Sequence, residues 1–179
     1  MTERILKENL FSDVVGQINA TTLLDAVLRK KRVAPSYLFV GPEGVGRKLT
    51  ALRFLEGLIN NGSPNIKIRK RLENRNFPDL LWLEPTYTHQ GNLITKSTAI
   101  NEKISRRSLP QIRLEQIKEM KRFLGKQPVE FSSGLIVIED LETITEAAAN
   151  ALLKTLEEPN HGIFILISEK PELILNTII

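Results

Sequence analysis

The stretch that decides the fold is residues 135–159, LIVIEDLETITEAAANALLKTLEEP. Its first four residues are apolar and mostly β-branched, which predicts a strand buried on both faces. Thr145 suits a helix N-cap, the alanines and leucines after it favour helix, and Pro159 ends the helical pattern. Glu139 and Asp140 stand directly after the strand, at the sheet edge where α/β proteins bind their ligands.

An earlier segment has the order strand, glycine-rich turn and helix. Residues 37–40 (YLFV) are a short β-prone run, residues 41–48 (GPEGVGRK) follow directly, and a helical pattern of leucines resumes at residue 49. This order is that of a phosphate-binding loop, in which backbone N–H groups and a helix N-terminus attract phosphate. The nucleotide-binding candidates in this loop are Gly41, Gly44, Gly46, Arg47 and Lys48.

The loop departs from the full motif G-x-x-x-x-G-K-[ST] at its last two positions. Arg47 stands where the motif has lysine, and Lys48 stands where it has a hydroxyl. The planar guanidinium can neutralise phosphate but differs in shape from an ammonium group, and Lys48 cannot coordinate Mg²⁺, which takes oxygen ligands. We therefore expect weak or absent ATP hydrolysis and leave nucleotide binding open. An ordinary strand–helix turn is the alternative interpretation of the glycines.

The composition fits one α/β domain in a reducing compartment. The chain has 179 residues and a mean hydropathy of −0.13, and it has no cysteine, which excludes disulfides and thiolate zinc sites. No apolar run reaches the length of a membrane span, and MTERILKENLF at the start lacks the apolar core of a secretion signal. We therefore expect a cytoplasmic protein without membrane contact. A net charge of +4 is compatible with a polyanionic partner but does not indicate one.

Two polar segments interrupt the α/β pattern. Residues 60–77 hold a turn followed by a basic run, which predicts a solvated helix or loop. Residues 86–109 have little apolar periodicity and are predicted to be a long polar insertion. Between them, residues 80–83 (LLWL) predict a second buried strand with Trp82 in the core. Neither histidine of the chain has the neighbours that a metal site or a catalytic triad needs.

The remaining apolar runs complete the pattern. Residues 112–124 carry apolar residues at helical spacing, with Lys118, Lys121 and Arg122 directed outward. These three cations would contact a DNA backbone or simply face solvent. Residues 163–167 (IFILI) predict a further buried strand, and Ser168 stands at its end.

Taken together, these segments resemble the nucleotide-binding core of AAA+ proteins. Within that class they resemble the clamp-loader subunits of bacterial DNA polymerase III, the delta-prime subunits most closely. The segments that carry the resemblance are residues 11–17 (FSDVVGQ), 36–46 (SYLFVGPEGVG), 112–124 (IRLEQIKEMKRFL) and above all 145–159 (TEAAANALLKTLEEP). It implies one P-loop NTPase-type α/β core over residues 1–179, a three-layer sandwich with a mainly parallel central sheet.

The resemblance also implies roles for single residues. Glu139 falls at the position of the family's Mg²⁺-linked aspartate and Asp140 at that of its water-activating glutamate, so the two acids are exchanged in order. Val15 would line an adenine pocket, and Ser168 lies near the first sensor position. We treat the acids as a degenerate pair and assign no catalytic residue and no metal ligand, because solvated strand-end acids are an equally good interpretation.

The implied cofactors are ATP or ADP with Mg²⁺. Zinc is not expected, because residues 60–77 form a basic loop where related subunits carry a cysteine zinc module. The family's arginine-finger turn, lid and collar domains would follow residue 179, so we expect a chain truncated before them.

The function that the resemblance implies is that of a delta-prime-like clamp-loader subunit in DNA replication. Such a subunit would be a component of the DNA polymerase III holoenzyme with little or no ATPase activity of its own. Its partners would be the delta and gamma/tau subunits in a hetero-oligomeric ring and, through that complex, the sliding clamp and primed DNA. An active gamma/tau-like ATPase is the alternative, and a stand-alone P-loop kinase is a third class.

Overall fold

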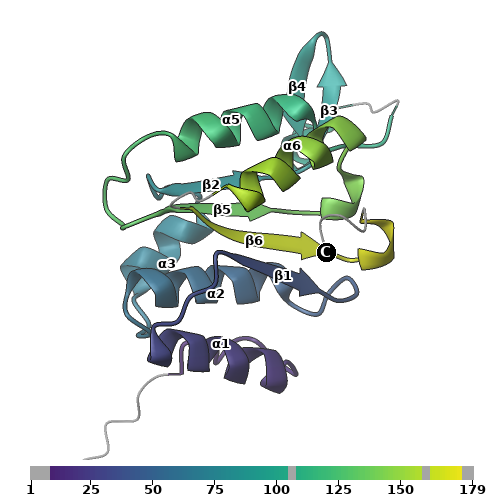
Figure 1. Ribbon diagram of the computed structural model, residues 1–179. Helices are drawn as coiled ribbons and strands as arrows, with labels where there is room; N and C mark the ends of the chain where they lie inside the picture. The colour runs from purple at the N-terminus through teal and green to yellow at the C-terminus, as the bar shows by residue number, and fades with distance from the viewer. Residues whose placement is uncertain (1–8, 105–107, 159–161, 175–179) are drawn as a thin grey trace, which may run out of the picture. The chain divides into compact units, whose positions relative to one another are not determined.

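The computed structural model describes residues 9–104, 108–158 and 162–174 (Figure 1). These residues fall into two compact units. The first unit takes in the described residues up to Ala34 together with Glu43–Phe77. The second takes in Pro35–Pro42 together with the described residues from Pro78 onward. In the part of the chain that the structure describes, the first unit is helical and the second contains the strands.

The first unit is built around helix α2 (Arg47–Ile59), which contacts α1 (Ile18–Lys30) and α3 (Ile66–Glu73). The side chains of Phe54 and Leu55 on α2 are completely buried. Gly57 lets the backbone of α2 approach its neighbours closely, because a Cβ there would lie 2.5 Å from side-chain atoms of both Leu10 and Leu28. Helix α3 lies within the basic segment 60–77, for which the sequence left helix or loop open, and Asn65 caps it by accepting from two backbone N–H groups.

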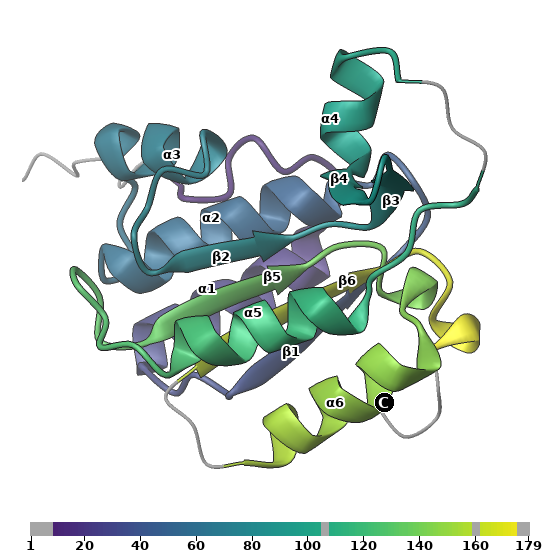
Figure 2. The ribbon, with the colours of Figure 1, turned by 90° about the horizontal axis from the view of Figure 1, so that it is seen from above.

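The second unit contains the sheet that the sequence predicts. Its strands are β1 (Ser36–Val40), β2 (Leu80–Leu83), β5 (Gly134–Ile138) and β6 (Gly162–Ser168), and their order is β1-β6-β5-β2. Each neighbouring pair is parallel, and Figure 2 shows the strands running side by side. All five residues of β5 are buried, which confirms the prediction of a strand covered on both faces. The prediction of an α/β protein with a parallel central sheet is therefore confirmed.

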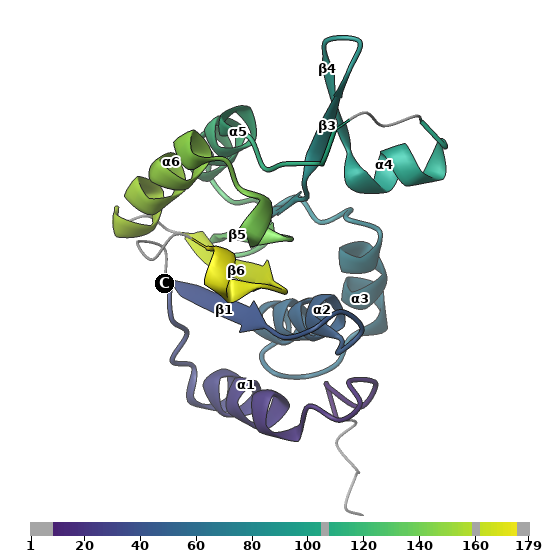
Figure 3. The same cartoon turned by 90° about the vertical axis from the view of Figure 1, so that its right-hand side faces the viewer.

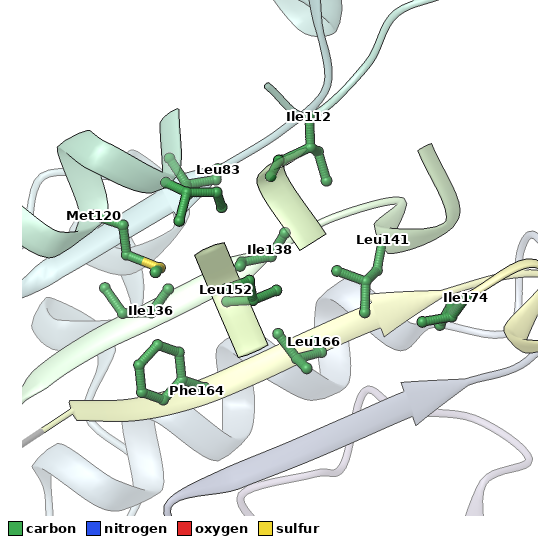
Figure 4. Close-up of a cluster of buried hydrophobic side chains, with 12 residues drawn as sticks. Leu83, Ile112, Met120, Ile136, Ile138, Leu141, Leu152, Phe164, Leu166 and Ile174 are labelled. Atoms are coloured by element: carbon green, nitrogen blue, oxygen red, sulfur yellow. The ribbon is translucent and has the colours of Figure 1, made fainter. Parts of the chain in front are cut away.

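Helices α5 (Leu114–Leu124) and α6 (Glu146–Glu157) pack against each other on one face of this sheet (Figures 2 and 3). Their apolar sides meet the strands in a core that includes Met120, Ile138, Leu152 and Phe164 (Figure 4). Helix α6 begins directly after Thr145, as predicted, although the Thr145 side chain makes no capping hydrogen bond. Pro159, predicted to end the helix, lies outside the described residues.

The polar segment 86–109 is folded over its described part. A hairpin of β3 (Thr86–His89) and β4 (Asn92–Thr95) leads into the short helix α4 (Lys96–Asn101). Gln90 and Gly91 form the hairpin turn, and both have positive φ (50° and 80°), as a two-residue turn between twisted strands requires. The hairpin projects from the sheet in Figures 1 and 3.

Short turns connect the sheet to its helices. The 3₁₀ turn η1 (Leu141–Thr143) joins the acids after β5 to α6, and η2 (Pro171–Leu173) follows β6. Trp82 on β2, predicted to lie in the core, is only partly buried, and its indole N–H donates to a polar partner described below. Among the described helices, none is long and apolar enough to cross a lipid bilayer.

Candidate functional site at the carboxyl edge of the sheet

The two predicted acids end strand β5 at the carboxyl edge of the sheet. The backbone N–H of Glu139 still pairs with the carbonyl of Leu83 on β2 at 2.9 Å, so Glu139 continues the strand. Asp140 leaves the strand with a φ of 47°. Aspartate is one of the few residues that tolerate this left-handed conformation, and it turns the chain into η1. The backbone therefore fixes both acids, Glu139 by its pairing with β2 and Asp140 by the turn into η1.

Glu139 is buried, with 2% of its surface exposed. Its Oε1 accepts a hydrogen bond from the indole Nε1–H of Trp82, the neighbouring strand's partly buried tryptophan. A buried carboxylate needs such donors, because burial without them costs several kcal/mol. The indole N–H of Trp82 thus serves as a hydrogen-bond donor to Glu139, which its position in an apolar run does not predict.

Asp140 forms an ion pair with Lys96, the first residue of α4. The Lys96 Nζ atom lies 2.7 Å from Oδ2 of Asp140. The side chain of Asp140 is 18% exposed and that of Lys96 is 43% exposed. The hydrogen bond to Asp140 raises the pKa of Lys96 above 10.5, and the charges of Asp140 and Glu139 act in the same direction against partial burial. Lys96 is therefore the cation of the acid pair.

The backbone beside Lys96 is anchored to the end of β2. The Lys96 N–H donates to the Pro85 carbonyl at 2.8 Å. The buried carboxylate of Glu84 accepts from the Ser97 backbone N–H at 3.0 Å and from the Ser97 hydroxyl at 2.6 Å. The Glu84 carbonyl in turn accepts from the side-chain amide of Gln116 on α5 at 2.8 Å. These contacts hold the start of α4 against the sheet.

Ser168, the predicted sensor-like residue, ends β6 at the same edge. It is completely buried, and its hydroxyl donates to Oε2 of Glu142 in η1 at 2.8 Å. Its carbonyl accepts from the Gly41 N–H at 3.4 Å, where β1 ends. The structure therefore brings four predicted site residues to one edge of the sheet. They are Gly41, Glu139, Asp140 and Ser168.

The other predicted nucleotide-binding residues belong to the first unit. Gly44 and Gly46 have φ values of 84° and 88°, a conformation that glycine adopts freely and that a phosphate-binding loop uses. Gly46 precedes α2, and the Nη1 atom of Arg47 is buried without a hydrogen-bond partner among the described residues. Lys48 is exposed, and Val15 is 85% exposed. This local conformation is compatible with phosphate, and the nucleotide assignments stay predictions.

The acid pair does not fit a magnesium ion. Mg²⁺ requires carboxylate and water oxygens in near-octahedral geometry and is repelled by a neighbouring cation. Here one carboxylate is buried against an indole N–H and the other is paired with an ammonium group. Within the described ranges there is also no group of three or more His, Cys, Asp and Glu side chains that could hold a metal.

Sequence reasoning missed Lys96, Glu84 and the second role of Trp82. Lys96 and Asp140 are 44 residues apart, and only the hairpin brings them together. The one available signal is the dipeptide Gln90-Gly91 between short runs rich in β-branched residues, which indicates a hairpin but not where it docks.

Comparisons with known proteins agree with this fold. The crystal structure of a DNA polymerase III gamma subunit-related protein from Thermotoga maritima matches with a TM-score of 0.57 at 21% identity. The match covers 88% of this chain and 42% of that one. The likeness agrees with the predicted fold class, an α/β core with a parallel central sheet.

Two curated relatives come from Bacillus subtilis. The DNA polymerase III subunit delta′ is 32% identical over 163 residues, which is 88% of this chain and 43% of that protein. The DNA polymerase III subunit tau is 28% identical over 183 residues, which is 98% of this chain and 28% of that protein. This chain therefore spans less than half the length of these relatives.

The family described as "DNA polymerase III, delta subunit" matches residues 16–179. The matched range includes the acid edge, the glycine turn and both helices that cover the sheet. The chain belongs to this DNA polymerase III subunit family.

Proposed function

We propose that this chain acts as a delta-prime-like subunit of the bacterial clamp loader in DNA replication. Membership of the DNA polymerase III subunit family supports the proposal, as do relatives named delta′ in two species, Bacillus subtilis and Pseudomonas aeruginosa. The proposed partners are the delta and gamma/tau subunits of a hetero-oligomeric ring. The ring would place the sliding clamp on primed DNA.

In this proposal the chain is a rigid ring member with little or no ATP hydrolysis of its own. The observation that carries this part is the ion pair of Lys96 and Asp140, which engages one of the two acids on which a motor subunit would rely. The replacement of the motif's lysine and hydroxyl by Arg47 and Lys48 supports it independently. ATP or ADP binding without turnover is compatible with both observations.

Reconstitution with purified delta and gamma/tau subunits tests the assembly. We expect the full chain to co-purify with them and to support clamp loading, while the chain alone releases no phosphate from ATP above background. Failure to associate with either subunit would overturn the clamp-loader assignment. Turnover by the chain alone at the rate of an AAA+ motor would overturn the passive role.

The alternative function is that of an active gamma/tau-like ATPase. Its support is the breadth of the match to proteins named tau or gamma/tau, which extends over 94–98% of this chain. Glu139→Gln separates the two functions, because it would abolish the turnover of a motor and leave clamp loading by a passive subunit unchanged.

A further inference from the structure

We propose that Lys96 is an internal counter-cation that takes the place of a metal ion at Glu139 and Asp140, so that this edge of the sheet excludes divalent cations. The inference deepens the proposed function and rests on it in one respect. The resemblance to clamp-loader ATPases is the reason to expect a metal ion at these two acids. Its evidence is the set of contacts at the edge itself.

The first argument is the charge that Lys96 supplies. Its Nζ atom is 2.7 Å from Oδ2 of Asp140, close enough for a charge-assisted hydrogen bond. A divalent ion on Asp140 would lie within a few ångströms of the ammonium group, or it would have to displace it. Repulsion between neighbouring cations in a partly buried place is strong, because water screens it only in part.

The second argument is that Lys96 is held in position. Lysines on a protein surface are mobile, and fixing one in a single geometry normally costs side-chain entropy. Here the Lys96 N–H is bound to the Pro85 carbonyl, and Ser97 is bound twice to the buried carboxylate of Glu84. These contacts fix the backbone from which the Lys96 side chain extends. The ion pair with Asp140 therefore has to order the side chain alone and not the backbone as well.

The third argument is where Lys96 stands in its own helix. It is the first residue of α4, at the end where the backbone dipole disfavours positive charge. Local helix stability therefore does not account for a lysine at this position. The carboxylate of Asp140 does, since it offsets the charge of the ammonium group.

The fourth argument concerns the other acid. Glu139 is 2% exposed, and its Oε1 accepts from the Trp82 indole. This contact occupies one of the two carboxylate oxygens, and the burial of the side chain leaves little room for the water ligands that a divalent ion keeps. Both carboxylates are thus engaged by groups of the chain, one by a hydrogen-bond donor and one by a cation.

Binding of Mn²⁺ as the probe ion, measured by electron paramagnetic resonance without nucleotide, tests the proposal on the full chain. The variant Lys96→Met removes the cation and keeps an apolar stem of similar length. We expect Lys96→Met to bind one Mn²⁺ at this edge at least tenfold more tightly than the wild-type chain does, a difference on the order of 1.4 kcal/mol. Adding Asp140→Asn to Lys96→Met is expected to abolish the gain.

The matched control is Lys103→Met, which removes an exposed lysine of the same segment and is expected to behave like wild type. If Lys96→Met does not fold, Lys96→Gln serves instead, because it removes the charge but keeps a hydrogen-bond donor. Trp82 is the only tryptophan of the chain, so quenching of its fluorescence by Mn²⁺ reports binding at this edge.

Equal Mn²⁺ affinity of wild type and both Lys96 variants, whether high or negligible, would overturn the proposal. The result is independent of the clamp-loader assignment, because no other subunit takes part. Loss of association with delta and gamma/tau would refute the proposed function and leave the metal measurement unaffected.

Discussion

The carboxylate of Asp79 accepts a hydrogen bond of 2.7 Å from the backbone N–H of Val129, which lies fifty residues further along the chain. The N–H groups of Glu130 and Phe131 bind the same carboxylate, also at 2.7 Å. Asp79 immediately precedes β2, and the loop it binds precedes β5. One buried side chain therefore fastens the entrances of two neighbouring strands.

Asp79→Asn should destabilise the second unit by about 1–3 kcal/mol, because an amide cannot accept from three N–H donors as a carboxylate does. Burial opposes ionisation of Asp79, but the three hydrogen bonds outweigh it and lower its pKa below 3.8. The stabilisation is therefore complete above pH 3.8 and is lost as the pH falls through the lower pKa of the folded state. Urea unfolding followed by Trp82 fluorescence at pH 7 and at acid pH measures both effects.

The control for Asp79 is Glu119→Gln, which removes an exposed carboxylate on α5. It should leave the free energy of unfolding within about 0.5 kcal/mol of wild type. A stability difference between Asp79→Asn and wild type that did not shrink at acid pH would contradict the role of the charge.

Arg53 lies among three acids of the first unit: Asp13, Glu73 and, at 3.8 Å, the completely buried Glu56. Its guanidinium donates to both oxygens of Asp13, with a shortest distance of 2.7 Å, and to Glu73 at 2.9 Å. The hydrogen bond from Arg53 is the main cause that lowers the pKa of Asp13. Arg53→Met should cost about 2 kcal/mol, less than the roughly 3–5 kcal/mol of a fully buried pair, because Asp13 and Glu73 are partly exposed and the buried Glu56 keeps its ion pair with Arg69.

Circular dichroism during thermal unfolding checks the Arg53 prediction. Arg53→Lys should recover only part of the loss, because an ammonium group cannot form the two-pronged contact with Asp13. Arg32→Met, at an exposed arginine after α1, should have little effect. Full recovery by lysine would show that charge alone matters at residue 53.

Leu152 on α6 is completely buried in the core beneath the helices (Figure 4). Leu152→Ala should lower the free energy of unfolding by about 2–5 kcal/mol through lost apolar burial and the cavity left behind. Asn150→Ala, at an exposed position on the same helix, is the control. Equal stability of the two variants, followed by Trp82 fluorescence, would contradict the packing of α6 on this sheet.

The double variant Arg47→Lys, Lys48→Thr restores the motif of the phosphate-binding loop. We expect it to bind a fluorescent ATP analogue about tenfold more tightly than wild type, because a compact ammonium group replaces the guanidinium and a hydroxyl replaces a cation. Phosphate release should stay at background, since Lys96 still neutralises Asp140. Mg²⁺-dependent turnover by this variant would show that the acid pair is competent as it stands.

The sequence predicted the strand β5, the acids after it and helix α6 correctly, because each depends on a local pattern of apolar and helix-favouring residues. The parallel sheet followed from the alternation of apolar runs and helical stripes. Ser168 and Gly41 were predicted at strand ends because each directly follows an apolar run in the sequence. All of these features can be predicted without knowing which segments of the chain contact one another.

The contacts of the acids were not predictable in this way. Lys96 lies in a segment without apolar periodicity, and its hairpin strands have only four residues each, too few for a clear pattern. Trp82 stands in an apolar run, where nothing distinguishes a core tryptophan from one that donates to a carboxylate. Asp79 likewise reads as a turn residue, and only the folded chain shows the loop that it binds.

The left-handed backbone at Asp140 restricts what redesign or natural drift can do at this position. Restoring the order aspartate then glutamate would place a longer side chain at a φ of 47°, where aspartate, asparagine and glycine are the residues best accommodated. Under the proposed assignment of Glu139 and Asp140 as an exchanged acid pair, the aspartate-then-glutamate order would therefore require a change of backbone conformation as well as two substitutions.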